Sequence, residues 1–164
     1  MQSLIDVYLY KTILVPHAGT SAGDEALKHA IHAAKDTSAK IIMLHIVEEI
    51  QYPRSFGLSE SERENMFNRI KEANEDIRKD MEKEMEKRMQ QCKDCNIESQ
   101  IKVVVGDAAE IILDVIDEEK VDLVVMAKRR KLTGMRKLLS LGSVSRKIVE
   151  NTSCPVLLID VENK

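Results

Sequence analysis

The sequence predicts an α/β fold: a single domain built on an open, parallel five-stranded sheet that carries helices on both faces. Five short β-rich runs alternate with segments of helical periodicity along the chain. The runs are almost continuously apolar, which is typical of strands buried on both faces of a parallel sheet. At 164 residues the chain has the length of one domain with a sizeable core.

The first two strands and the helix between them follow from local patterns. Residues 10–16 read Tyr-Lys-Thr-Ile-Leu-Val-Pro and predict a strand that becomes wholly apolar before a proline. The pair Thr20-Ser21 can cap a helix whose apolar residues recur at helical spacing over residues 26–34. Residues 40–47 form the second apolar run and predict the second strand.

A long helix is expected over residues 61–92, after a loop at residues 51–59 that contains a proline and a glycine. One apolar stripe follows this helix at intervals of three or four residues, while Glu and Lys fill its other faces. The pattern predicts a helix that packs along one stripe, against the core or in a dimer contact, and is otherwise solvated. The stripe consists of Met66, Ile70, Ala73, Ile77, Met81, Met85 and Met89.

Three further strands and two helices complete the alternation. They are a strand at residues 101–105 that ends at Gly106, a helix at 108–119, a strand at 121–126, a helix at 143–151 and a strand at 155–159. In open parallel sheets the ligand binds beyond the C-terminal strand ends, where the strand order reverses. The segments that leave the first and fourth strands, residues 17–20 and 127–134, are therefore expected to flank a ligand crevice.

The segment after the fourth predicted strand concentrates positive charge. Residues 123–149 contain eight Lys or Arg and no Asp or Glu, although the whole chain has a net charge of −3. Gly142 and Ser143 precede a helix, and a helix N-terminus attracts anions. Two interpretations stay open. Ser143 caps the helix through its hydroxyl, or the Gly-Ser pair binds a phosphate that the arginines of the basic cluster at residues 128–131 also grip.

Composition and motifs argue against several classes of function. Aromatic residues make up only 3% of the chain and Trp is absent, which does not favour a base-stacking nucleic-acid surface. No apolar run approaches the roughly 20 residues of a membrane span, and the first residues lack the pattern of a signal peptide. The odd count of three cysteines favours a reducing, cytoplasmic location. Without a P-loop, a G-x-S-x-G or a dinucleotide fingerprint, no enzyme is predicted.

Side chains that often carry chemistry have ordinary interpretations in this sequence. Cys92 and Cys95 form a lone C-x2-C, expected to be incidental at the frayed end of the long helix, with redox sensing as the alternative. The histidines show no metal-ligand spacing with this pair, so no metal site is predicted. His45 falls within a buried strand and is expected to be a hydrogen-bonded core histidine.

Six short pieces, taken in order over residues 10–159, are similar to the universal stress protein (UspA) family. The pieces are Ile13-Leu14-Val15-Pro16 with Gly19-Thr20, Leu44-His45-Ile46-Val47-Glu48, Val105-Gly106-Asp107, Val121-Asp122-Leu123-Val124-Val125-Met126, Leu141-Gly142-Ser143-Val144-Ser145 and Cys154-Pro155-Val156-Leu157-Leu158-Ile159. The resemblance implies a universal stress protein domain at residues 10–160 after an extension at residues 1–9, and an adenine nucleotide alpha hydrolase-like sheet in the order 3-2-1-4-5. It also implies a homodimer through the last strand, residues 155–160.

Part of this family binds ATP or AMP through the motif G-x2-G-x9-G-[S/T] after the fourth strand, and this sequence keeps only Gly142-Ser143. Depending on the alignment, Arg129 and Leu132 or Ala127 and Arg130 replace the two early glycines. Nucleotide-binding members usually carry an aspartate in Pro-x-Asp-Gly-Ser that contacts the nucleoside, and this chain has Ala18 at that place. The ATP-binding motif is therefore degenerate.

The resemblance nevertheless implies an adenine-nucleotide site in altered form, with adenine between the first two strands and the phosphate against the basic loop. The candidate residues are Pro16, His17, Ala18, the backbone of Ile46, Gly106, Ala127, Arg129, Arg130, Gly142, Ser143 and Val144. The expected function is regulatory binding of AMP, ATP or cyclic AMP in a stress response. The alternatives are a family member that has lost nucleotide binding and docks partners as a dimer, and a weak ATPase.

Overall fold

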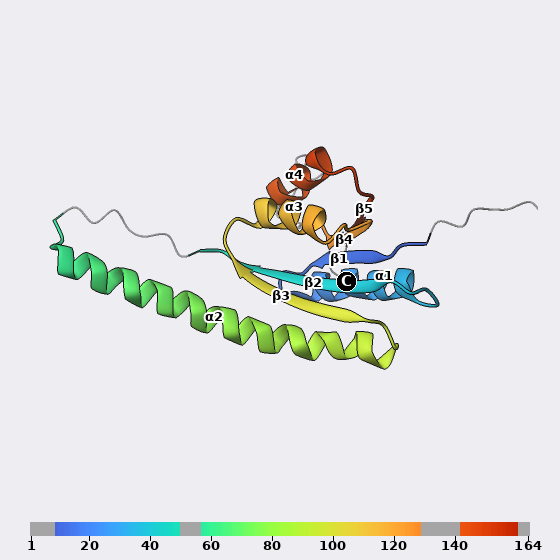
Figure 1. The fold of residues 1–164 in the computed structure, drawn as a ribbon, viewed down its shortest axis with the longest axis horizontal. Coiled ribbons are helices and arrows are strands. Elements are labelled where there is room, and N and C mark those ends of the chain that lie inside the picture. The colour runs from blue at the N-terminus through green and yellow to red at the C-terminus, as the bar shows by residue number, and fades with distance from the viewer. Residues whose placement is uncertain (1–8, 50–56, 129–141, 161–164) are drawn as a thin grey trace, which may run out of the picture.

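Parallel strands form the predicted sheet, in the order β3-β2-β1-β4-β5 (Figure 1). The computed structural model describes residues 9–49, 57–128 and 142–160. Neighbouring strands pair in parallel throughout, for example Ile13 beside Ile41 and beside Leu123. The strands are β1 (Thr12–Pro16), β2 (Lys40–Val47), β3 (Ser99–Val105), β4 (Leu123–Ala127) and β5 (Val156–Ile159). The predicted fold class and the strand order are both confirmed.

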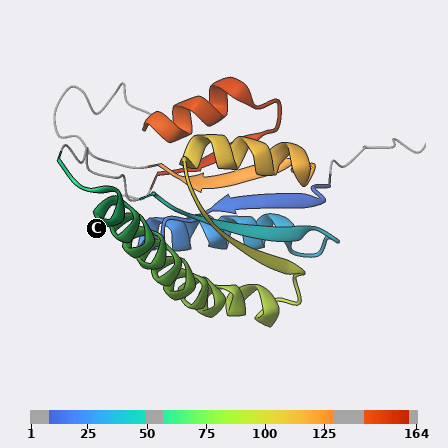
Figure 2. The same ribbon diagram turned by 60° about the vertical axis from the view of Figure 1, so that its left-hand side comes forward.

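Two helices cover each face of the sheet (Figures 1 and 2). The helices are α1 (Ser21–Ala34), α2 (Glu60–Asp94), α3 (Ala108–Glu118) and α4 (Ser143–Asn151). On β1, Ile13 and Val15 pack in the core beneath α1 and α2, whereas Leu14 packs in the core beneath α3 and α4. This alternation follows from the period of two in a strand and explains why β1 is apolar at consecutive positions.

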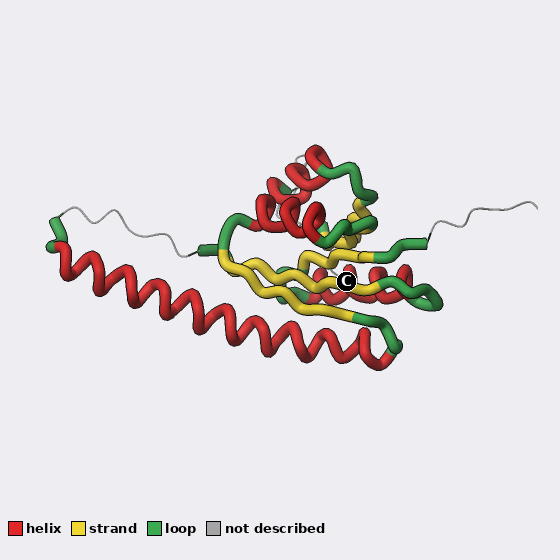
Figure 3. The backbone as a smooth tube through the Cα atoms, viewed as in Figure 1, coloured by secondary structure: helices red, strands yellow, loops and turns green. Residues whose placement is uncertain are grey.

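The predicted stripe of α2 joins the core only along the C-terminal part of the helix. Met85 and Met89 are buried in the core, and Met81 packs against it, whereas Ile77 is 41% exposed. The cause is length: α2 has 35 residues and therefore spans about 52 Å, whereas the 8 residues of β2 span about 27 Å. The N-terminal part of α2 extends past the sheet, as Figure 3 shows.

Side chains cap the first three helices. Thr20 caps α1 by accepting a hydrogen bond from the Gly23 N–H, as predicted for the Thr20-Ser21 pair. Ser59 and Glu62 form a reciprocal capping box on α2. Asp107 caps α3, accepting hydrogen bonds from two backbone N–H groups of its first turn.

The start of β1 differs from the sequence prediction. The strand begins at Thr12 rather than at residue 10, because the Asp122 carboxylate accepts hydrogen bonds from the N–H groups of Lys11 and Thr12. Asp122, which precedes β4, thus accepts the backbone N–H groups that would bond a neighbouring strand if β1 began earlier. The other strand boundaries lie within two residues of the predicted ones.

Candidate functional site

A cavity of about 190 Å³ lies beyond the C-terminal ends of β1, β2 and β4. β1 is the strand at which the order reverses, so this is the position at which open α/β sheets bind ligands. The starts of α1, α3 and α4 close the cavity. Its lining comprises Pro16, His17, Ala18, Thr20, Gly23, Leu44, Ile46, Glu48, Ala108, Ile112, Met126, Ala127, Val144 and Ser145.

The lining is mainly apolar, with a few polar groups. Leu44 and Ile112 are fully or almost fully buried and form its interior walls. Thr20 and Glu48 are exposed, and Ser145 is buried. An apolar cleft that carries a few polar groups is the usual chemistry of a small-molecule site.

The structure brings part of the predicted site together around this cavity. Six of the candidate residues line it, namely Pro16, His17, Ala18, Ile46, Ala127 and Val144. Gly106, Gly142 and Ser143 are described but are not among the lining residues. Gly106 instead donates its N–H to the Val47 carbonyl, 3.0 Å away. Arg129 and Arg130 lie outside the described residues.

Of the two interpretations of the Gly142-Ser143 pair, the one in which Ser143 caps α4 is wrong. The capping residue is Gly142, with extended backbone angles and no side-chain cap bond, and Ser143 is the first helical residue. The Gly142 carbonyl accepts the first helical hydrogen bond, from the Arg146 N–H at 2.9 Å. Thus α4 presents the positive end of its dipole without the side-chain cap that α1, α2 and α3 carry.

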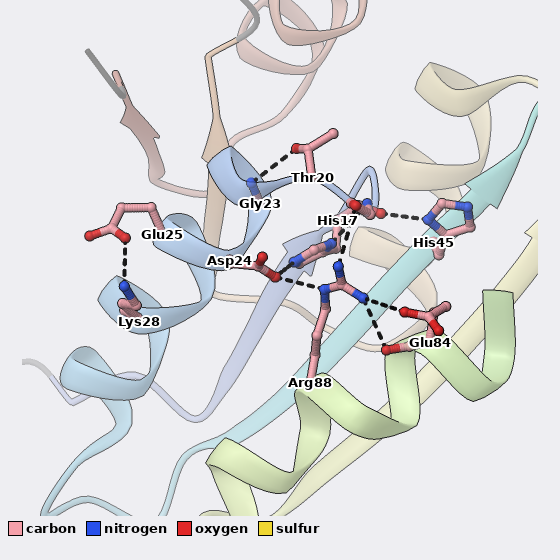
Figure 4. Close-up of polar contacts among 10 residues, drawn as sticks. His17, Thr20, Gly23, Asp24, Glu25, Lys28, His45, Glu84 and Arg88 are labelled. Atoms are coloured by element: carbon pink, nitrogen blue, oxygen red, sulfur yellow. Dashed lines mark hydrogen bonds and ion pairs between the residues drawn. The ribbon is translucent and has the colours of Figure 1, made fainter. Parts of the chain in front are cut away.

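The imidazole of His17 points toward Asp24 on α1 (Figure 4). Its side chain is 0% exposed, so the exposed part of His17 is backbone. Nδ1 accepts a hydrogen bond from the Gly19 N–H at 3.0 Å, which requires a neutral ring with its proton on Nε2. Nε2–H donates to Asp24 Oδ1, also at 3.0 Å. His17 therefore contributes backbone to the cavity and anchors the loop below it.

Arg88 on α2 binds the same loop from the other side (Figure 4). Its Nε lies 2.6 Å from Asp24 Oδ1, and its Nη2 donates to the Gly19 carbonyl at 3.3 Å. Its Nη1 donates to the Glu84 carbonyl, 3.1 Å away. The guanidinium thus connects α2 to α1 and to residues 17–20.

Burial is the main cause that lowers the pKa of His17, and the Asp24 carboxylate opposes it. The positive charge of Arg88 and the neighbouring His45 lower this pKa further. His45 meets the expectation of a hydrogen-bonded core histidine, because it is buried and its Nδ1–H donates to the His17 carbonyl at 2.7 Å. A neutral His17 thus sits between an acid and a guanidinium.

Sequence reasoning missed the anchoring residues. A signal existed for Gly23, because an isolated glycine inside a helical pattern usually has a packing reason: a Cβ on Gly23 would lie 2.8 Å from the His17 ring. No signal existed for Arg88, which reaches Asp24 across 64 positions of sequence.

The cysteine pair lies at the C-terminal end of α2, as expected, but this end packs in the core and is not frayed. Cys92 is buried in the core on the last turn of α2, and Cys95 is exposed at its C-cap. Burial raises the pKa of the Cys92 thiol to about 11, which leaves it a poor nucleophile at neutral pH.

The described ranges contain no group of three or more His, Cys, Asp or Glu placed to hold a metal ion. None of the helices in those ranges combines the length and apolar character that crossing a bilayer requires.

Comparison with known proteins places the chain among relatives of similar length. Residues 9–160 match the model of the universal stress protein family. Universal stress protein MJ0531 of Methanocaldococcus jannaschii is 30% identical over 157 residues, covering 95% of this chain and 85% of the relative. The solved structure of hypothetical protein MJ0577 of the same archaeon covers 96% of this chain and 100% of its own, with a TM-score of 0.77 and 24% identity.

Two further solved structures share the fold and carry nucleotides. One is a universal stress protein in complex with cAMP, with a TM-score of 0.57, 18% identity and coverage of 93% of this chain and 98% of its own. The other is the family protein At3g01520 of Arabidopsis thaliana with AMP bound, with a TM-score of 0.56, 17% identity and coverage of 93% of both chains. The family match over almost the whole chain, the curated relative and the shared sheet order agree, and the chain belongs to the universal stress protein family.

Proposed function

We propose that this chain binds an adenine nucleotide, namely AMP, ATP or cyclic AMP, at the strand-end cavity and acts as a regulatory module in a stress response. One observation carries the proposal: an apolar cavity lies at the reversal point of the sheet, and the first turn of α4 forms part of its wall. Two proteins of the same fold carry cAMP or AMP. We place this activity in the cytoplasm, in keeping with the odd cysteine count.

The cavity suits the base more than the whole nucleotide. Its volume is about 190 Å³, below the range of about 300–1,000 Å³ that is usual for drug-sized ligands. Apolar walls such as Leu44, Ile46 and Met126 offer contact to the faces of one ring system. The ribose and the phosphate would then extend past the rim toward solvent.

The phosphate is assigned to the N-terminus of α4. Val144 and Ser145 in its first turn line the cavity, and the capping residue Gly142 leaves no side chain between the free N–H groups and an anion. Lys128, which follows the cavity-lining Ala127, is half-buried, but the Asp160 carboxylate lies 3.8 Å from its Nζ and offsets its charge. That Arg129 and Arg130 grip the same phosphate remains a prediction.

A substitution at Ala18 tests the proposal through an expected rise in nucleotide affinity. It is exposed and lines the cavity, at the place where nucleotide-binding family members usually carry an aspartate. In Ala18→Asp the carboxylate can accept hydrogen bonds from the nucleoside, so affinity should rise about tenfold. Ser21→Asp is the matched control, since Ser21 is exposed on the same loop-to-helix segment and does not line the cavity.

The measurement is isothermal titration of the wild type and both variants with AMP, ATP and cyclic AMP. Mass spectrometry of small molecules released from the denatured wild type would show which ligand co-purifies. The proposal is wrong if neither the wild type nor Ala18→Asp binds any of the three at millimolar concentration. That result would favour a dimeric module that docks partners without a nucleotide, whereas steady phosphate release from ATP, lost in a Ser143 variant, would indicate a weak ATPase.

A further inference from the structure

The loop at residues 17–20 presents Ala18 and Thr20 to the cavity and turns its other side toward α2. Gly19 has φ +73, in the left-handed region that glycine adopts most readily. A Cβ at this position would lie 3.2 Å from the Met81 methyl on α2 and 3.9 Å from His45 Cε1 on β2. Side chains from α2 and β2 thus support the loop at its centre.

Side chains also bind the backbone polar groups of this loop. The Gly19 N–H donates to His17 Nδ1, and the Gly19 carbonyl accepts from Arg88 Nη2. The His17 carbonyl accepts from His45 Nδ1–H. The shape of the loop is therefore set by three side chains, two of which come from other elements of the fold.

Asp24 holds the two main anchors in register. A single oxygen, Oδ1, accepts both His17 Nε2–H at 3.0 Å and Arg88 Nε–H at 2.6 Å. The His17 ring is fully buried, and the Arg88 and Asp24 side chains are 20% and 33% exposed. An ion pair that served stability alone would need only Arg88 and Asp24. Here the guanidinium fork also reaches a backbone carbonyl next to two cavity-lining residues.

We propose that His17, Asp24 and Arg88 are positioning residues of the ligand site: they fix the 17–20 loop in the shape that receives the nucleoside. This inference rests on the proposed function and makes α2, which contributes no cavity-lining residue among those described, part of the binding machinery. His17 and Arg88 act on the Gly19 backbone, and Asp24 acts through these two side chains.

Two substitutions of His17 separate positioning from packing. His17→Asn places an amide oxygen near the Nδ1 position, where it can accept the Gly19 N–H, but cannot reach Asp24. His17→Gln places an amide N–H near the Nε2 position, where it can donate to Asp24, but loses the acceptor for Gly19. The positioning role predicts about tenfold weaker nucleotide binding for His17→Gln, which loses the bond to Gly19, and a smaller loss for His17→Asn, which keeps that bond and loses only the one to Asp24.

Arg88→Gln and Arg78→Gln form a second matched pair on α2. Arg78 bonds Glu75 and Glu82 on its own helix, whereas Arg88 bonds Asp24 and Gly19. Arg88→Gln should weaken nucleotide binding about tenfold, and Arg78→Gln should leave it unchanged. Thermal melts would show whether each variant is folded.

Amide hydrogen exchange at Gly19 tests the loop without any nucleotide. The chain has six glycines, so this signal can be assigned in a nitrogen-edited NMR spectrum. Its exchange should be slow in the wild type and in His17→Asn, and faster in His17→Gln and Arg88→Gln. Unchanged exchange in both of the latter variants would overturn the inference.

The outcomes separate this inference from the proposed function. If the wild type binds AMP, ATP or cyclic AMP and His17→Gln and Arg88→Gln bind as tightly, the positioning role is wrong and the proposed function stands. If the wild type binds none of the three, the proposed function and the role in nucleotide binding fail together. The rate of amide exchange at Gly19 then still decides whether His17, Asp24 and Arg88 order the loop.

Discussion

At the scale of single residues, His17 and Gly23 share one small volume between the end of β1 and the start of α1. A Cβ on Gly23 would lie 2.8–2.9 Å from three atoms of the His17 ring, closer than real Cβ contacts occur. Gly23 is the third residue of α1, and glycine within a helix costs up to about 1 kcal/mol relative to alanine. At this position the missing methyl group makes room for the imidazole that anchors the loop.

Gly23→Ala should therefore destabilise the fold although alanine is the better helix former. Overpacking costs about 1–3 kcal/mol and the helix gains about 1 kcal/mol, so a net loss of about 1 kcal/mol is expected in urea unfolding. In a His17→Ala background the clash is absent, and Gly23→Ala should instead stabilise by about 0.5–1 kcal/mol. A change in unfolding free energy of the same sign in both backgrounds would contradict this steric pairing of Gly23 with His17.

The neutral state of His17 predicts a loss of stability in acid. The pKa of His17 is lowered in the folded chain, chiefly by burial, whereas an unfolded histidine titrates near about 6.5. Between the folded pKa and about 6.5 the unfolded chain binds the extra proton, so stability rises with pH across this window. The contribution is fully present above about pH 6.5 and is lost as the pH falls through the folded pKa.

The measurement is denaturant unfolding at a series of pH values for the wild type and His17→Gln. The wild type should lose more stability than the variant between neutral and mildly acidic pH, because the variant has no titrating ring at this position. Parallel pH profiles of the two proteins would assign the acid sensitivity to other groups.

At the scale of elements, the C-terminal part of α2 packs in the core, whereas its N-terminal part extends past the sheet (Figure 3). Met85 is 0% exposed in the core, whereas Ile77, two turns earlier on the predicted stripe, is 41% exposed. Met85→Ala should cost about 2–5 kcal/mol of unfolding free energy, and Ile77→Ala less than about 1 kcal/mol. Chemical denaturation of both variants checks this, and equal losses would mean that the stripe packs along its whole length.

The elements were largely predictable because their apolar periods are local. Each predicted strand and helix is present, and β2 and α4 have the predicted bounds. The starts of β1, β3 and β4 each lie two residues from the predicted positions, and at β1 a distant side chain, Asp122, accepts the backbone N–H groups. The stripe on α2 was visible in the sequence, but its partial exposure was not, since no local pattern gives the length of the sheet beneath a helix.

The site was predictable in position but not in detail. The rule that ligands bind at the reversal of strand order placed the crevice beside residues 17–20 and the end of β4, where the cavity lies. The direction of the His17 ring was not predictable, because it depends on Asp24 and on Arg88, whose place in the fold is set by packing. The cap of α4 was not predictable either, because it depends on whether the helix begins at Ser143 or one residue later. The helix begins at Ser143, so Gly142 is the capping residue.

At the scale of the whole molecule, the sheet ends at β5 on one side. Within the described residues β5 pairs only with β4, and its residue Leu157 is 42% exposed. An edge strand that exposes a large apolar residue can pair with a second copy. We therefore keep the prediction of a homodimer through residues 155–160.

Leu157→Lys should convert this dimer to a monomer, because a charge on the edge strand opposes close pairing. Light scattering coupled to size-exclusion chromatography gives the mass directly. Val149→Lys is the matched control: Val149 is also 42% exposed but lies on α4, outside the last strand. A monomeric wild type, or a loss of mass in the control as well, would contradict an interface at β5.

The contrast between Cys92 and Cys95 gives this molecule a built-in reporter of local opening. Alkylating reagents attack thiolates, so the exposed Cys95 should label readily, whereas Cys92, buried and with a pKa of about 11, should label only when the end of α2 leaves the core. The ratio of the two labelling rates within one molecule measures the free energy of that opening. Ligand added during labelling would then show whether occupancy of the cavity tightens the attachment of α2 at its far end.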